Sequence, residues 1–144
     1  MKKNIVILVI LVIIIIFSIS GLLITNSNTI KKIKNYNSQY EYYLDKTIYG
    51  TELATLVNKA VNSNENNNIQ KDDKGFYLDN GQNSIKIDIK MNTNGKTYQM
   101  ETIYNNDITK FVENFNLVKF KCNNIDYHKN SGRVSKLYFE EILE

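Results

Sequence analysis

The sequence predicts an α+β fold, in which a long N-terminal helix and a second short helix precede a mainly antiparallel sheet of about five strands with one inserted helix. Three observations support this class. An uncharged apolar run from Ile5 to Ile24 continues into a segment with apolar residues three and four positions apart. Residues 51–64 repeat that helical spacing. From Phe76 onward the spacing falls to two, which indicates strands with one buried face.

The first helix is long enough to cross a bilayer. The run from Ile5 to Ile24 has 20 residues, and at about 1.5 Å per residue it spans roughly 30 Å of hydrocarbon. Ile5 to Phe17 has the length of a signal-peptide core, and small residues follow at Ser18-Ile19-Ser20. The apolar run nevertheless continues through Gly21 to Ile24. Its length therefore favours a retained anchor, with the lipid bilayer as its partner, over a cleaved signal.

Lysines flank the apolar run on both sides. Lys2 and Lys3 adjoin it directly, whereas a second cluster begins seven residues beyond its end (Lys31, Lys32 and Lys34). Lysine next to a span marks the cytoplasmic side, and long domains translocate largely regardless of charge. We therefore expect a single-pass protein of the cell membrane, with a cytoplasmic N-terminus and a domain outside the cytoplasm.

Beyond the span the helix becomes one-sided, which predicts an amphipathic stalk. Its apolar positions are three or four residues apart: Ile30, Ile33, Tyr36, Tyr40, Tyr43 and Leu44. We expect the part from Tyr40 to Leu44 to pack on the sheet of its own chain. Ile30, Ile33 and Tyr36 are the candidate contacts with a partner protein or a second copy.

The remaining elements follow from spacing and turn chemistry. Thr51 is a possible N-cap for the second helix, and Asn106 or Asp107 for the inserted one. Turn sequences such as Asn94-Gly95 separate the strands. The predicted strands are residues 76–78, 84–91, 96–104, 117–125 and 133–143, and the predicted inserted helix is 107–115.

Composition bounds the domains and their partners. We expect a transmembrane anchor over residues 1–25 and one extracytoplasmic domain, with its stalk, over 26–144. From residue 25 onward the formal charge is +1, which is too small for a nucleic-acid footprint. The single cysteine excludes an internal disulfide framework. The abundance of Asn and Ile is typical of proteins from low-GC genomes.

No motif in the chain identifies a reaction. His128 has no second His or Cys partner for zinc and is expected in an exposed turn. Cys122 alternates with Phe120 and Val118, which favours a buried packing role over a catalytic thiol served by His128. The acidic loop from Asp72 lacks the spacing of a calcium loop. The sequence therefore predicts a protein that is not an enzyme, with no catalytic, cofactor or metal site.

An apolar helix that continues as a stalk and leads into a small sheet resembles the layout of type IV pilins and minor pseudopilins. The second half, "YQMETIYNNDITKFVENFNLVKFKCNNIDYHKNSGRVSKLYFEEI", resembles minor pseudopilins in its order of strand, helix, strand, turn and strand. The processing site of that family has Gly or Ala before the apolar segment and a Glu shortly after the cleavage point. This chain has Lys2-Lys3-Asn4 and then Ile5 to Phe17, so it lacks the residues for peptidase cleavage and Glu-directed assembly. The composition is also similar to that of single-pass proteins of low-GC Gram-positive bacteria.

Two functions remain open on this evidence. The first is a membrane-anchored structural or assembly subunit, which the resemblance would place in a secretion or surface-filament apparatus. The second is an anchored binding or sensor module for an unidentified ligand. A subunit needs the face of Ile30, Ile33 and Tyr36 partly free for a neighbour, whereas a sensor can bury all of it.

Overall fold

The computed structural model describes the backbone of residues 2–143, and the side chains within it except those of residues 2–6, 8, 9 and 21–24. The expected lysine flank at Lys2 and Lys3, and the last part of the predicted span, lie outside the described side chains. The chain forms two compact units, Met1–Asn35 and Tyr36–Glu144.

Helix α1 runs from Lys2 to Glu41. Among the described residues, Ile10–Glu41 is long and apolar enough to cross a membrane, and none of its apolar window is buried within the protein. Ser18 and Ser20 donate their hydroxyl hydrogens to the carbonyls of Ile14 and Ile16, each at 2.8 Å. These bonds satisfy the only two hydroxyls among residues 10–20, so a membrane-spanning helix tolerates them.

The second unit contains a five-stranded sheet, which confirms the predicted α+β class. The strands lie in the order β1-β4-β5-β2-β3. The β2–β5 pair is parallel and every other neighbouring pair is antiparallel. The elements are β1 (Thr47–Tyr49), α2 (Gly50–Asn66), β2 (Lys86–Met91), β3 (Lys96–Gln99), α3 (Met100–Asn105), α4 (Ile108–Phe115), β4 (Lys119–Tyr127) and β5 (Val134–Ile142).

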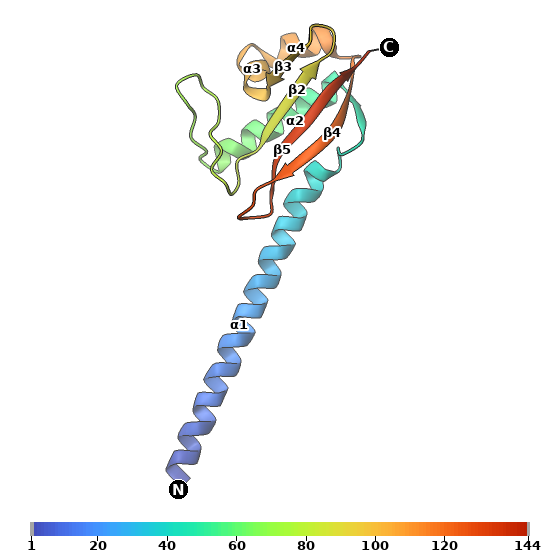
Figure 1. Cartoon of the computed structure of the whole chain (residues 1–144). Coiled ribbons are helices and arrows are strands. Elements are labelled where there is room, and N and C mark those ends of the chain that lie inside the picture. The colour runs from blue at the N-terminus through green and yellow to red at the C-terminus, as the bar shows by residue number, and fades with distance from the viewer. Residues whose placement is uncertain (1, 144) are drawn as a thin grey trace. The chain divides into compact units, whose positions relative to one another are not determined.

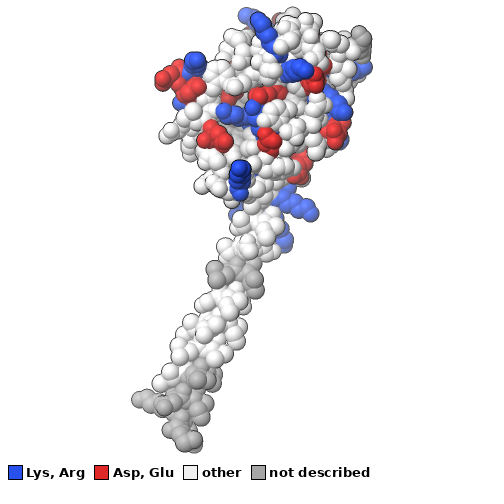
Figure 2. Space-filling model, in the orientation of Figure 1, with Lys and Arg blue, Asp and Glu red and all other residues white. Residues whose placement is uncertain are grey.

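The helices α2, α3 and α4 lie on one face of the sheet (Figure 1). The core between these layers includes Leu53 and Val57 of α2, Ile87 and Ile89 of β2, and Phe120 of β4. The other sheet face carries acidic and basic side chains interspersed among uncharged ones (Figure 2). Cross-strand ion pairs join Lys90 to Glu140 and Lys136 to Asp88, each at 2.6 Å.

Two predicted strands are wrong in part or whole. Residues 76–78 form only an isolated bridge between Lys71 and Tyr77. The predicted strand 96–104 stops at Gln99, where α3 begins. Met100 and Ile103 are both buried in the core, and this spacing of three fits a helix as well as Tyr98, Met100 and Thr102 fit a strand. Packing against the core decides between them.

The start of α2 also differs from the prediction. Tyr49, not Thr51, occupies the N-cap position, with extended backbone and no side-chain cap bond. Residues Thr47–Tyr49, which were not predicted to form a strand, pair with β4 as β1. A three-residue strand is too short to show a period, so hydrophobic patterning could not find it.

Candidate functional site

The three predicted contact residues of α1 differ in exposure. Ile30 is 58% exposed, Ile33 is half-buried, and Tyr36 is half-buried and packs against the core of the second unit. One turn further on, Tyr40 is fully buried, its ring centroid 5.2 Å from that of Tyr36. The apolar face is therefore exposed at its start and buried at its end.

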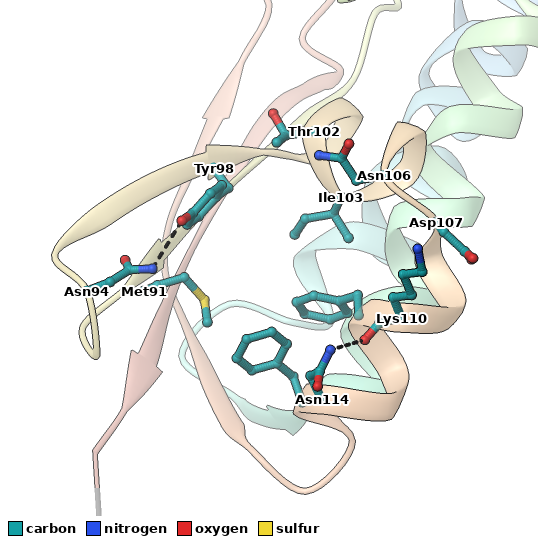
Figure 3. Close-up of a pocket in the computed structure, with 11 residues that line it drawn as sticks. Met91, Asn94, Tyr98, Thr102, Ile103, Asn106, Asp107, Lys110 and Asn114 are labelled. Atoms are coloured by element: carbon teal, nitrogen blue, oxygen red, sulfur yellow. Dashed lines mark hydrogen bonds between the residues drawn. The ribbon is translucent and has the colours of Figure 1, made fainter.

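A pocket of about 260 Å³ lies between the β2–β3 hairpin and helices α3 and α4 (Figure 3). Met91 and Tyr98 line one side, and Ile103 lies on the opposite side (Figure 3). Phe111 and Phe115 of α4 also line the pocket. The two phenylalanine rings are 5.1 Å apart between centroids. Polar residues complete the lining: Asn94, Thr102, Asn106, Asp107, Lys110 and Asn114.

Hydrogen bonds orient the polar edge of this pocket. Asn94 donates its side-chain amide to the Tyr98 hydroxyl at 3.0 Å, and Asn114 donates to the Lys110 carbonyl at 2.8 Å (Figure 3). Asp107 caps α4 by accepting from the Thr109 N–H at 2.9 Å, and this bond lowers the pKa of its carboxyl. A cavity of about 150 Å³ accommodates a benzene ring, so this pocket has room for one aromatic or branched apolar group.

His128 is buried, at 4% exposure, so the predicted exposed turn histidine is wrong. Its Nε2 is 2.7 Å from the Ser84 carbonyl oxygen, and its Nδ1 is 3.5 Å from Asp79 Oδ1. These contacts join the turn after β4 to the loop before β2. The contact between Ser84 and His128 could not be predicted from local sequence spacing, because 44 positions separate the two residues.

The Asp79, Ser84 and His128 side chains form a cluster, but its hydrogen bonds do not suit nucleophilic catalysis. A carbonyl only accepts, so His128 Nε2 donates to it and cannot take a proton from the Ser84 hydroxyl 3.4 Å away. The Ser84 hydroxyl instead donates to Asp79 at 2.9 Å. The arrangement holds the loop in place.

Cys122 is fully buried, as predicted. Burial raises the pKa of its thiol to about 11, and its sulfur contacts the Asn124 carbonyl at 3.7 Å. His128 makes its contacts with Ser84 and Asp79 instead, so it does not serve the thiol as a base. Within the described part of the chain, no group of three metal-ligating side chains comes together.

No protein-family model, curated protein or solved structure matches this chain.

Proposed function

We propose that this chain is a single-pass membrane protein of the cell membrane that presents its α+β unit outside the cytoplasm as a non-enzymatic structural or assembly subunit. The observation that carries the proposal is the unburied apolar surface of α1. Exposed apolar area of this extent is costly in water. Lipid can cover the predicted span as far as Ile24, and Ile30, six positions further on, is exposed and available to a protein neighbour.

The resemblance to pilins and minor pseudopilins supports this proposal at the level of layout. A helix whose first part is apolar and whose later part has one apolar face is suited to side-by-side packing of subunits. The proposal needs no peptidase cleavage, because nothing in the contact between helices depends on a free N-terminus.

Crosslinking in membranes tests this proposal. The full chain with Ile30→Cys, oxidised or treated with a short bismaleimide in its native membrane, should give a dimeric or higher species. Lys32→Cys lies about 200° around the helix from position 30 and serves as the matched control. Equal yields from both variants, or none from either, would contradict assembly through this face.

A second pair of variants separates assembly from folding. Ile30→Glu should abolish the crosslinked species formed through a neighbouring engineered cysteine while leaving the melting temperature unchanged. Tyr40→Glu should lower the melting temperature, because it places a charge where a fully buried ring packs. A silent Ile30→Glu in both measurements would remove the support for an assembly surface.

The pocket in Figure 3 favours a second function, an anchored binding module. Its aromatic walls and amide edge suit one apolar group of a ligand or peptide. A photo-crosslinking residue in place of Asn114, at the pocket edge, should yield one adduct of defined mass. The same residue in place of Glu113, which is exposed but does not line the pocket, should not.

A further inference from the structure

A second, larger hollow lies between the last turns of α1 and the outer side of α2. It has a volume of about 590 Å³, and all of its lining residues belong to the second unit. Its lining is almost wholly polar or aromatic: Tyr36, Gln39, Tyr40, Thr55, Asn58, Lys59, Asn62, Ser63, Asn66, Asn67 and Arg133. We call it the amide groove, because five of these residues carry a side-chain amide.

The amide groove is locally cationic in a unit that is not. Residues 36–144 carry 13 basic and 15 acidic side chains, a net charge of −2. Of the described residues that line the groove, Lys59 and Arg133 are charged and none is acidic. On the sheet face, by contrast, Lys90 and Lys136 each form an ion pair with a carboxylate.

Both cations lie over aromatic rings and not against carboxylates. Lys59 Nζ is 5.4 Å from the Tyr40 ring centroid, and Arg133 Cζ is 5.0 Å from that of Tyr36. Neither forms an ion pair with any described residue. A cation over a ring keeps its N–H groups at the edge of the guanidinium or ammonium available for an acceptor.

The two tyrosines line the groove with their rings. Their hydroxyl oxygens are buried, and burial raises the pKa of both phenols. Ser63 and the neighbouring phenol lie close enough to each hydroxyl to affect that pKa as well. The tyrosines therefore contribute ring faces beneath Lys59 and Arg133 and not hydrogen-bond donors to the groove.

We propose that the amide groove binds an oxyanion, the carboxylate or phosphate group of a ligand, through Arg133, Lys59 and the amides of α2. The chemistry of the lining selects this class. Arginine matches the two oxygens of a carboxylate or phosphate, and lysine contributes a point charge. The amide N–H groups are further donors. This proposal is independent of whether the chain assembles through α1.

Calorimetric titration of the full chain in uncharged detergent micelles tests the proposal. The probes are inorganic phosphate and citrate, each titrated in chloride buffer of constant ionic strength. We expect saturable binding of at least one probe at millimolar concentration. Arg133→Gln and Lys59→Gln should each weaken it about tenfold or more, as the loss of a charged hydrogen bond does. No saturable binding of either probe would overturn the proposal.

Two controls separate a site from general charge and from a structural role. Lys110→Gln removes one positive charge at the other pocket and should leave affinity unchanged. A loss equal to that of Lys59→Gln would show nonspecific attraction and contradict the proposal. Tyr40→Phe keeps the buried ring and removes the hydroxyl. It should leave affinity unchanged, because the ring beneath Lys59 remains and the hydroxyl oxygen is buried. A large loss of affinity in Tyr40→Phe would contradict this arrangement of the groove.

A third experiment distinguishes a lipid headgroup from a soluble anion as the ligand. Phosphate binding is compared in liposomes of phosphatidylcholine alone and with added phosphatidylglycerol. If phosphate binds less tightly in the anionic liposomes than in those of phosphatidylcholine alone, and this loss of affinity is larger than the loss that Lys110→Gln causes, a lipid headgroup occupies the groove. Equal binding identifies a soluble anion.

Discussion

The side chain of Asn64, on α2, makes two hydrogen bonds with the backbone of Ile85, just before β2. It accepts from the Ile85 N–H and donates to the Ile85 carbonyl, both at 2.8 Å. Asn37 on α1 makes a similar pair, accepting from the Val134 N–H at 2.9 Å and donating to the Gly132 carbonyl at 2.8 Å. Both asparagines are buried. Each one joins a helix to the start of a core strand.

Asn64→Ala should lower the free energy of unfolding by about 2–4 kcal/mol, because it leaves a buried N–H and a buried carbonyl unpaired at once. The full chain in detergent, unfolded with urea and followed by circular dichroism, gives the value. Asn66→Ala, on an exposed position of the same helix, is the matched control and should change it by less than about 0.5 kcal/mol. Equal effects would mean that the two bonds to Ile85 contribute nothing.

The burial of these two asparagines could not be predicted from the sequence. Helical spacing identified α1, α2 and α4, and alternation identified β2, β4 and β5, because each of these elements buries one continuous face. Asparagine abundance, by contrast, pointed only to genome composition. Nothing in the sequence distinguishes buried Asn64 from its exposed neighbours Asn62 and Asn66, because the difference lies in a strand 21 positions away.

The candidate sites also differ in how far the sequence predicts them. The sequence predicted that Ile30 and Ile33 stay accessible and that the part from Tyr40 to Leu44 packs on the sheet. Ile30 is exposed and Tyr40 is buried, but Ile33 is half-buried and Leu44 is 40% exposed. Leu44 lies beyond the end of α1 at Glu41, so helical spacing does not apply to it.

The sequence did not predict either pocket, since each one joins residues from several elements. Arg133 is the only arginine in the chain, but its position in the sequence does not indicate that it lies beside α2 in the amide groove.

The thiol of Cys122 should be almost unreactive in the folded chain. It is fully buried, and burial raises its pKa to about 11, so little thiolate exists at pH 8. A chromogenic disulfide reagent measures the rate at pH 8, with and without urea. Ile30→Cys supplies an exposed thiol in the same chain and should react promptly. Equally fast reaction of the unsubstituted folded chain would contradict the burial of Cys122.

Asp79 should add to stability at neutral pH and cease to do so in acid. Hydrogen bonds from the Gly81 N–H and the Ser84 hydroxyl, together with nearby His128, lower the pKa of its carboxyl in the folded state. A group with a depressed folded pKa stabilises the fold above its unfolded pKa of about 3.9 and loses this effect as pH falls through the folded value.

Asp79→Asn should therefore flatten the fall in unfolding free energy below about pH 4. Urea midpoints between about pH 3 and 6 measure that fall. The change should be small, because the Asp79 side chain is 65% exposed and solvent screens its charge. The exposed Asp73→Asn is the control. If both variants keep the slope of the unsubstituted chain, Asp79 does not contribute to acid sensitivity.

Gly50, the first residue of α2, lies against the end of α4, and substitution there should destabilise the fold. A Cβ added at Gly50 would lie 2.0 Å from the carbonyl oxygen of Phe115 and 2.7 Å from its carbonyl carbon. Both atoms are backbone, so no side-chain rotation relieves the clash. The Gly50 N–H also donates to the Val118 carbonyl at 2.9 Å, which ties the start of α2 to the segment before β4.

Gly50→Ala should consequently lower the free energy of unfolding by at least the 1–3 kcal/mol or so that overpacking costs, even though alanine favours helices over glycine by about 1 kcal/mol. Thr51→Ala, at the next and exposed position, should change it by less than about 0.5 kcal/mol. Both values come from the same urea titration. The sign of the change in unfolding free energy distinguishes the two effects. Helix propensity alone predicts that Gly50→Ala stabilises the chain, whereas the contact with Phe115 predicts that it destabilises the chain.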